Sequence, residues 1–348
     1  MRVEQLTFTR FIAAISIVIF HYGKASPLFN NKYLSFLFKN ANVGVSYFFI
    51  LSGFVMIIAY ANKGNVSFYS YIKNRLARIY PVYILTILLV FFYDKDYVGK
   101  GVDLFLSVLM LQSWLPHKAL ILNYPSWSIS VEIFFFILFP FLLNRIYSRM
   151  KFRNIFIIVV LFWLMSQIVH NLIYSEVITV PFYGKKDMMY FPVLHLNEFL
   201  VGNLSGLFFI KYYKDYKKNY TIPIVVSLII IMLLLKFPVG LNLHNGLLAV
   251  IFCPFIILLA LSNDKITQFF SKKIFVFLGE ISFGVYLLQY PVWMFFSDDV
   301  MSRYFSLHKD FDYTSSFLVR VLILLLVASL SYLYFEKPAK KLIKLYSN

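Results

Sequence analysis

The chain has 348 residues, of which 60% are hydrophobic, 20% are aromatic and 14% are charged. This composition excludes an ordinary soluble globular domain and indicates a polytopic membrane protein. The net charge of +17, from 33 basic and 16 acidic residues, would suggest nucleic-acid binding in a soluble protein. Here the basic residues cluster in short loops between apolar runs, as they do in cytoplasmic loops of membrane proteins. We therefore expect contact with membrane lipid and no nucleic-acid partner.

Ten apolar runs predict the helices that cross the membrane. Each is close in length to the roughly 20 apolar residues that a spanning helix needs. In chain order the runs are 6–23, 43–61, 79–93, 129–147, 154–173, 193–210, 221–236, 245–262, 274–296 and 315–335. The sequence therefore predicts an all-α polytopic membrane helix bundle of about ten transmembrane helices. We expect one transmembrane domain over residues 1–348, with no appended soluble domain.

The basic loops predict on which side of the membrane the chain begins and ends. Loops rich in Lys and Arg should stay in the cytoplasm. The basic segments are 63–78, 145–153, 211–218, 264–273 and the tail after residue 336. If the N- and C-termini are both cytoplasmic, all of these segments lie in the cytoplasm and the less basic loops between them lie outside. This alternation requires that the short apolar stretch 102–115 does not cross. We therefore expect a re-entrant or interfacial segment near 102–128, a candidate lining for a cavity.

The single cysteine, Cys253, lies within an apolar run. One cysteine cannot form an intramolecular disulfide and suggests no thiolate metal site, so we expect a packing role for it and no metal. The first apolar run has no small-residue cleavage site. We therefore interpret it as a retained first helix.

Arg10 and His21 are ionisable residues inside that first apolar run. Eleven steps of about 100° bring both side chains to one helix face, about 16 Å apart. An ionisable group in hydrocarbon is costly, so it usually faces the bundle interior and has a function. The alternatives are that Arg10 snorkels to the cytoplasmic headgroups and that His21 is an interfacial histidine.

A second basic pair, Arg75 and Arg78, lies just before Pro81, which we expect to open the third span. A spacing of three residues brings the two guanidinium groups to one helix face. Such a pair suits a phosphate group, although ordinary positive-inside topology would also explain it.

Ser128 and Glu132 lie four residues apart at the start of the fourth span, and Glu132 precedes Ile-Phe-Phe-Phe. A carboxylate in such a stretch is costly unless it is paired, so we expect a functional or pairing role. Asn197 and Glu198 enter the sixth span, and the polar segment 279–289 begins the ninth. For these two, helix packing through glycine and small polar residues is the simpler explanation.

Taken together, these residues resemble the acyltransferase-3 family of integral membrane acyltransferases. The resemblance rests on motifs spread over nearly the whole chain: Arg10-x10-His21, the segment 44–53, Arg75-x-x-Arg78-Ile-x-Pro81, Trp127-Ser128-x-x-x-Glu132, Glu198-Phe-Leu-x-Gly202, Ser282-x-x-x-Tyr286-Leu-Leu and Phe335-Glu336-x-Pro338. Two positions depart from the family pattern. Phe283 stands where tyrosine is common, and Gln289 stands where histidine is common. These departures put the ninth-span motif in doubt as a source of catalytic groups.

The resemblance implies a membrane O-acetyltransferase of a bacterial cytoplasmic (inner) membrane. Such a protein transfers an acyl group, usually acetyl from acetyl-CoA, to a sugar hydroxyl of a surface or exported polysaccharide. The expected partners are acyl-CoA as donor substrate, a glycan or lipid-linked saccharide as acceptor, and membrane lipid. A homo-oligomer is left open.

Acyl transfer from a thioester to an alcohol needs a base that works near neutral pH, and histidine is the usual choice. His21 is the candidate, either as base or as transient acyl carrier, with Glu132 or Ser128 orienting it if their helices touch. The remaining candidates bind the donor phosphates: Arg10, Arg75 and Arg78.

Two other functions remain open from the sequence. A transporter or flippase for a lipid-linked glycan would also have ten or more helices and intramembrane charges, although no inverted repeat is visible. A structural partner in a polysaccharide-assembly complex is the second alternative. Inactivity of a well-folded preparation with every acyl-CoA offered would favour that second function.

Overall fold

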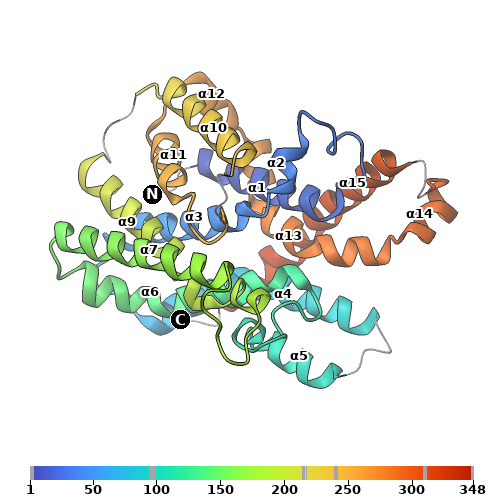
Figure 1. Ribbon diagram of the computed structural model, residues 1–348, viewed down its shortest axis with the longest axis horizontal. Helices are drawn as coiled ribbons and strands as arrows, with labels where there is room; N and C mark the ends of the chain where they lie inside the picture. The colour runs from blue at the N-terminus through green and yellow to red at the C-terminus, as the bar shows by residue number, and fades with distance from the viewer. Residues whose placement is uncertain are drawn as a thin grey trace.

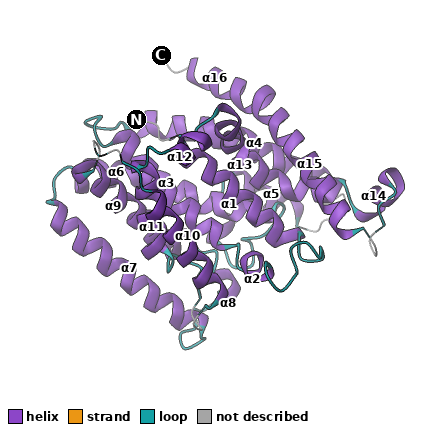
Figure 2. Cartoon of the chain, turned by 90° about the horizontal axis from the view of Figure 1, so that it is seen from above, coloured by secondary structure: helices purple, strands orange, loops and turns teal. Residues whose placement is uncertain are grey.

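The computed structural model describes residues 4–93, 99–213, 216, 218–238, 242–308 and 312–345. These described residues form helices joined by turns and loops, with no β-strand among them (Figures 1 and 2). Each predicted apolar run overlaps a helix. The helices are α1 (Gln5–Tyr22), α3 (Val43–Tyr60), α4 (Phe68–Tyr93), α6 (Trp127–Phe141), α7 (Phe152–Tyr174), α9 (Leu196–Tyr212), α10 (Thr221–Lys236), α11 (Ala249–Leu261), α13 (Lys273–Phe295) and α15 (Tyr313–Ser331). The prediction of a polytopic helical bundle is therefore confirmed.

Eight of these helical segments, among the described residues, are long and apolar enough to cross a membrane. The other two, α10 and α11, have 16 and 13 residues. Helix α11 starts four residues later than predicted because Asn245 and Gly246 have φ of 75° and 93°. Such left-handed residues cannot continue a right-handed helix.

Helix α4 shows one prediction to be wrong. Pro81 does not open the span, because the helix begins at Phe68 and Pro81 lies inside it. Proline is tolerated within membrane helices, where neighbouring groups satisfy the freed backbone carbonyl. Arg75 and Arg78 therefore belong to the helix itself and not to a preceding loop.

Five short helices lie between the long ones: α2 (Ser35–Lys39), α5 (Lys100–Val108), α8 (Lys185–Met188), α12 (Lys265–Phe270) and α14 (Asp298–Phe305). A sixth, α16 (Lys337–Leu345), follows the last long helix. Segment 102–128 contains most of α5 and two single 3₁₀ turns. A nine-residue helix rises only about 14 Å, less than half of the roughly 30 Å hydrocarbon core. This stretch therefore forms no spanning helix, as predicted.

Hydrogen bonds hold segment 102–128 against the bundle. Tyr83 donates to the Ser107 carbonyl at 2.6 Å, and Ser130 donates to the Met110 carbonyl at 2.6 Å. Within the segment, Gln112 donates to the Ser126 carbonyl at 3.1 Å. These bonds satisfy carbonyl groups that a broken helix leaves open, which is the condition for irregular backbone at membrane depth.

Glycines let the central helices approach closely. A Cβ on Gly202 of α9 would overlap the Ile50 carbonyl of α3, and one on Gly53 would overlap the Phe199 carbonyl. Between α1 and α13, a Cβ on Gly279 would overlap the Thr7 carbonyl. Small residues at such crossings are typical of membrane bundles. The packing role expected for the start of the sixth span and for segment 279–289 is therefore present: the first brings α9 against α3, and the second brings α13 against α1.

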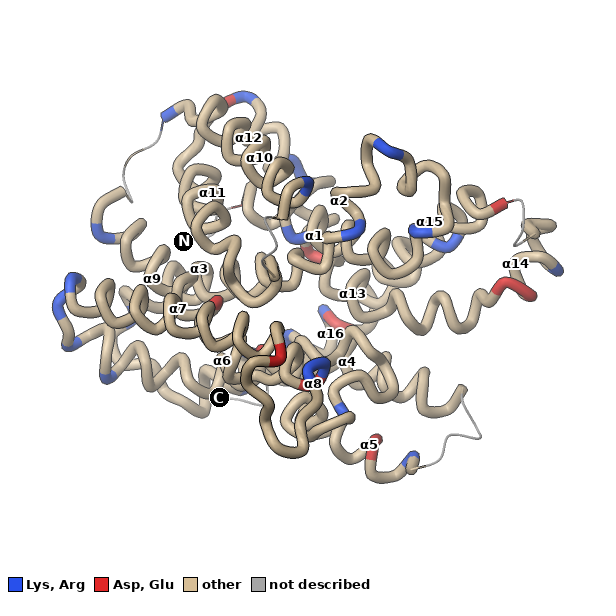
Figure 3. Tube along the Cα trace, in the orientation of Figure 1, with Lys and Arg blue, Asp and Glu red and all other residues tan. Residues whose placement is uncertain are grey.

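The two ends of the described chain meet at one side of the bundle. Leu6 and Thr7 of α1 line a cavity together with Lys337 and Lys340 of α16. Figure 3 shows the basic residues gathered mainly at helix ends and connections. Both features agree with termini on the same side, and the cytoplasmic assignment of that side stays a prediction.

Candidate functional site

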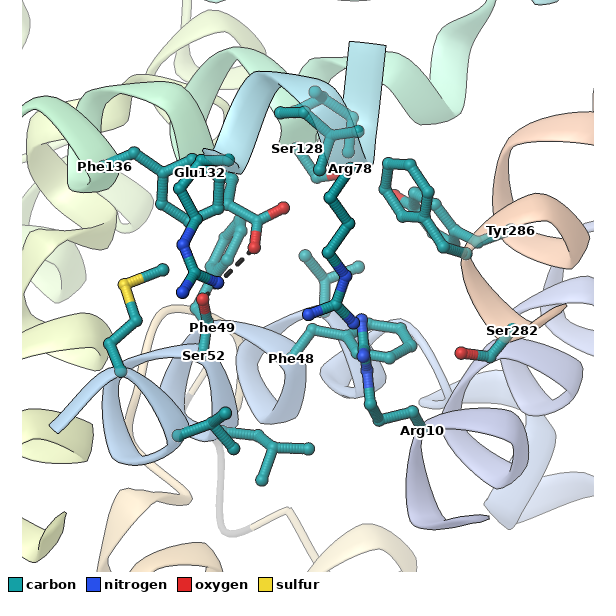
Figure 4. Close-up of a pocket in the computed structure, with 18 residues that line it drawn as sticks. Arg10, Phe48, Phe49, Ser52, Arg78, Ser128, Glu132, Phe136, Ser282 and Tyr286 are labelled. Carbon is teal, nitrogen blue, oxygen red and sulfur yellow. Dashed lines mark hydrogen bonds between the residues drawn. The ribbon is translucent and has the colours of Figure 1, made fainter. Parts of the chain in front are cut away.

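Five of the six predicted site residues line one cavity (Figure 4); they are Arg10, Arg75, Arg78, Ser128 and Glu132. The cavity encloses about 90 Å³ and lies between α1, α3, α4, α6 and α13. These residues come from three separate helices, so their grouping arises only when the bundle packs. The sixth residue, His21, lies outside this cavity.

Glu132 is the carboxylate in this cavity. Ser52 of α3 donates a hydrogen bond to Glu132 Oε1 at 3.1 Å. The charges of Arg10, Arg78 and Arg75 all act on the same carboxylate. Figure 4 shows Arg10 and Arg78 reaching toward each other across the cavity. Three guanidinium groups against one carboxylate leave an excess of two positive charges, so the cavity suits an anionic ligand.

Aromatic rings hold Arg75. Its guanidinium carbon lies 5.2 Å from the centre of the Tyr60 ring and 5.3 Å from the centre of the Tyr71 ring. Its buried Nε has no hydrogen-bond partner in the described part of the chain. Cation–π contact fixes the group without using that donor. The Nε–H group of Arg75 is therefore available to an acceptor oxygen of a bound ligand.

The arginine cavity continues into a second, wider cavity of about 440 Å³. Arg10, Arg78 and Phe283 line both. The wider cavity is also lined by Lys337 and Lys340 of α16 and by two acidic residues, Glu280 and Glu336, and it lies at the side of the bundle where the two chain ends meet. With Arg10 and Arg78 the basic side chains outnumber the acidic ones by four to two, so an anionic molecule meets a net positive charge along this route.

His21 lies at the other end of α1, where Gln289 of α13 holds it. Its Nδ1 is 2.8 Å from Gln289 Oε1, and the Tyr124 ring packs against the imidazole edge-on with centres 4.9 Å apart. Gln289 is fully buried, and its amide nitrogen donates to the Tyr286 carbonyl at 2.6 Å. That second bond directs the amide oxygen toward His21.

This arrangement selects one tautomer of His21. An amide oxygen only accepts hydrogen bonds, so Nδ1 must carry the hydrogen. In the neutral ring Nε2 then has the free lone pair, and it forms no hydrogen bond with the described part of the chain. Nε2 is thus the atom able to take a proton or an acyl group.

Neither Glu132 nor Ser128 orients His21, contrary to the expectation from the sequence. The Glu132 carboxylate accepts from Ser52, while Ser128 donates to the Pro125 carbonyl at 3.1 Å. Helix α13 connects the arginine cavity with the surroundings of His21. Tyr286 lines the arginine cavity, and Gln289 follows it by one helical turn and holds His21.

Sequence reasoning missed three contributors: Ser52, Tyr286 and Gln289. Each lies in one of the sequence motifs, and a polar side chain in an apolar helix is the signal that could identify it. Gln289 departs from the family pattern, so the motif does not mark it. Its partner lies 268 residues away in the chain, so only the folded structure reveals the pair.

Asn197 and Glu198 form part of a separate buried network. His195 Nδ1 is 2.8 Å from Glu198 Oε2, and His195 Nε2 is 2.9 Å from the Met189 carbonyl. Asn197 accepts a hydrogen bond from Gln167 of α7. None of these side chains lines the arginine cavity. They fasten the start of α9 to its neighbours, which agrees with the simpler interpretation of this segment.

Segment 102–128 lines another cavity, of about 310 Å³. His117 and Leu122 border it together with Lys100 and Tyr290. The Tyr290 ring packs against Tyr124, with centres 4.9 Å apart. This cavity therefore lies one aromatic residue away from the His21 imidazole.

In the described residues, His, Cys, Asp and Glu side chains nowhere gather in threes that could hold a metal ion.

Comparison with known proteins matches residues 3–336 to a family described as "Acyltransferase domain". Acyltransferase MdmB of Streptomyces mycarofaciens is 29% identical over 210 residues, which cover 57% of this chain and 51% of that protein. O-acetyltransferase OatA of Staphylococcus aureus (strain NCTC 8325 / PS 47) is 26% identical over 374 residues, covering 95% of this chain and 56% of that protein.

The chain thus spans about half the length of the curated relatives it matches. No solved structure matches it. The family match extends over nearly the whole chain, and it includes all the helices that line the arginine cavity and hold His21. The chain therefore belongs to the acyltransferase-3 family.

Proposed function

We propose that this protein is a membrane O-acyltransferase that carries acetyl from cytoplasmic acetyl-CoA to a hydroxyl group of a cell-surface or exported glycan. We further propose that it works as a multi-pass protein of the bacterial cytoplasmic membrane. One observation carries the proposal: helix α1 bears Arg10 in a cavity with an excess of guanidinium groups, and bears His21, with Nε2 free to react, at its other end. Two relatives whose names describe an acyltransferase and an O-acetyltransferase support it.

The donor end of the proposed route is the pair of basic cavities. Coenzyme A carries several phosphate groups at one end and its thiol at the other. Guanidinium groups bind phosphate through charge-assisted, forked hydrogen bonds. Arg10, Arg75 and Arg78, with Lys337 and Lys340 along the approach, supply such partners. The extended pantetheine arm would then point the thioester along α1 toward His21.

The reaction at His21 needs its free Nε2. As a base, Nε2 takes the proton of the acceptor hydroxyl while that oxygen attacks the thioester carbonyl; the carbon–sulfur bond breaks, and the proton passes to the departing thiolate. As a carrier, Nε2 itself attacks the thioester carbonyl, the carbon–sulfur bond breaks and coenzyme A leaves as thiolate. The acceptor hydroxyl then attacks the acyl group on Nε2, the carbon–nitrogen bond breaks to restore the imidazole, and the hydroxyl proton passes to the thiolate. Gln289 serves both routes in the same way, because it keeps the hydrogen on Nδ1.

The acceptor end of the proposed route is the cavity beside Tyr290. Its lining includes Lys100, His117 and Tyr290, and Tyr124 connects Tyr290 with the His21 ring. Polar side chains beside an aromatic surface suit a sugar, which presents hydroxyl groups at its edges and apolar faces. The reacting hydroxyl would approach His21 from this side.

His21→Ala tests the proposed activity. We expect the variant to insert and accumulate like the wild type but to abolish glycan acetylation, because no other group takes over the proton or the acyl group. The measurement is the acetyl signal by NMR in glycan from a deletion strain complemented with each variant. Full acetylation by His21→Ala would contradict the role of His21, and loss by both His21→Ala and a control, His308→Ala, would point to a defect of folding.

A further inference from the structure

A long apolar groove lies on the face of α1 that turns away from Arg10 and His21. It has a volume of about 420 Å³ and runs between α1, α10 and α11, with α2, α3 and α12 closing its ends and floor. None of its lining residues borders the arginine cavity or the wider basic cavity. Its contents are therefore separate from the proposed donor route.

The apolar part of the groove has about the depth of one membrane leaflet. On α10 the lining begins at Thr221, and its apolar residues run from Ile224 to Leu235. Eleven steps of 1.5 Å each give about 16 Å for this apolar part, close to half of the roughly 30 Å hydrocarbon core. Val225 and Leu228 on its rim are 45% and 42% exposed. The groove is thus open to the surrounding hydrocarbon along its length.

Three polar side chains that line the groove, Thr9, Tyr47 and Asp264, are already paired. The Thr9 hydroxyl is hydrogen-bonded to the Tyr47 hydroxyl at 2.6 Å. At the end of the groove that α12 closes, Asp264 accepts hydrogen bonds from the Thr267 amide at 2.8 Å and from the Ser262 hydroxyl. A ligand that fills the groove therefore gains mainly by burying apolar surface, which a hydrocarbon chain provides and a polypeptide backbone does not.

One end of the groove is basic. The two segments that flank it there, 23–42 and 236–248, contain four lysines and no Asp or Glu in their sequence. Lys39 lies between the lining residues Leu37 and Ala41, and Lys236 follows the lining residue Leu235. Both lysines are exposed. The Asn40 side chain donates to the Leu235 carbonyl at 3.0 Å and holds the two segments together at this mouth.

We propose that the groove binds a phospholipid with an anionic headgroup. One hydrocarbon chain fills the space between α1 and α10, and the lipid phosphate lies at Lys39 and Lys236. The topology predicted from the basic loops assigns both segments to the outer side, where lysines are not expected from the positive-inside rule. An anionic headgroup accounts for this excess of positive charge.

Native mass spectrometry of the purified full chain tests the headgroup. The probes are phosphatidylglycerol and phosphatidylcholine with identical acyl chains. We expect one saturable phosphatidylglycerol per protein and weaker retention of phosphatidylcholine. Each lysine near a lipid surface contributes about fivefold in affinity, so Lys39→Gln with Lys236→Gln should weaken phosphatidylglycerol about 30-fold. The matched control is Lys151→Gln with Lys186→Gln, two exposed lysines away from the groove, which should change nothing.

A groove-filling variant tests the chain site. Ser16→Phe adds a ring to the groove wall and should remove the saturable lipid, whereas Leu326→Phe on the exposed apolar face of α15 should retain it. Equal thermal unfolding of the two variants excludes misfolding. A lipid shortened by two methylenes should bind the wild type about 15-fold more weakly.

Three results would overturn the proposal. Equal retention of both lipids by all variants would remove the headgroup site. Undiminished binding by Ser16→Phe would move the lipid elsewhere. A dimer that Ser16→Phe dissociates would assign the groove to a second copy of the chain.

Discussion

At the scale of single residues, the contact between His21 and Gln289 determines what the histidine can do. The sequence pointed to His21 because an ionisable group inside an apolar run requires an explanation. It could not identify the partner, because a glutamine in a distant helix becomes a neighbour only through packing. The arginines were easier to group, since helical spacing alone brings Arg75 and Arg78 to one face. Their convergence on Glu132 depends on how α1, α4 and α6 pack.

Gln289 is expected to position His21 without touching the reacting atoms. Gln289→Leu removes the acceptor for Nδ1, so the ring loses its fixed tautomer and orientation. We expect kcat to fall about 10- to 100-fold, the loss that is typical when a metal-binding histidine loses the partner that orients it. KM for acyl-CoA should not change, because the arginine cavity is intact. Steady-state kinetics of the purified protein provide the comparison.

Gln289→Glu separates positioning from simple packing. A glutamate keeps the acceptor but adds a negative charge that favours the imidazolium form of His21. The base must be neutral to react, so the acidic limb of the pH–rate profile should move to higher pH while activity at high pH recovers. An unchanged profile in Gln289→Glu, together with wild-type kcat in Gln289→Leu, would show that this contact has no catalytic consequence.

Arg75 and Arg78 are expected to bind the donor phosphates. Replacing either by alanine removes a charge-assisted contact worth on the order of 1.5 to 3 kcal/mol, or about 10- to 150-fold in affinity for coenzyme A. Calorimetry on the purified variants measures this loss. Arg153→Ala, an exposed arginine at the start of α7, is the control. Wild-type affinity for coenzyme A in both variants would show that Arg75 and Arg78 do not bind the donor and only follow the positive-inside rule.

At the scale of helices, composition predicted which segments are helical but not all of their limits. Long apolar runs are recognisable without any tertiary information, so every predicted run overlaps a helix. A hydropathy pattern does not detect the start of α4, because the first three turns of the helix contain Lys73, Arg75 and Arg78. The predicted start of α11 is too early because Asn245 and Gly246 adopt a left-handed turn, and the turn preference of Asn-Gly is not part of a hydropathy pattern.

The close crossing of α1 and α13 is expected to be essential for the site. Gly279→Ala would insert a Cβ where the Thr7 carbonyl lies, so the helices must separate. Overpacking of this kind costs about 1 to 3 kcal/mol, and it should also weaken the contact between His21 and Gln289. We expect a lower midpoint of thermal unfolding and a lower kcat. Gly101→Ala is the matched control, because its Cβ would meet no heavy atom within 4 Å.

At the scale of the whole molecule, the proposed transfer requires the basic cavities to open to the cytoplasm. The N-in topology predicts that 145–153 is cytoplasmic and that 297–312 is outside, although residues 309–311 lie outside the described part of the chain. Single cysteines at Ser148 and Ser306, both exposed, in a Cys253→Ala background should label oppositely with an impermeant maleimide in intact cells. Ser306→Cys should react and Ser148→Cys should not. The reverse pattern would turn the arginine cavity away from the acyl-CoA pool.

The central claim is that one chain binds acyl-CoA at its arginines and transfers the acyl group through His21. The most direct measurement follows radiolabelled acetyl and free coenzyme A thiol together, in membranes that contain the protein and an acceptor glycan. The wild type should release one thiol for each acetyl group that appears on the glycan. His21→Ala should bind coenzyme A with wild-type affinity and release none. Equal thiol release and glycan labelling by His21→Ala would contradict the account.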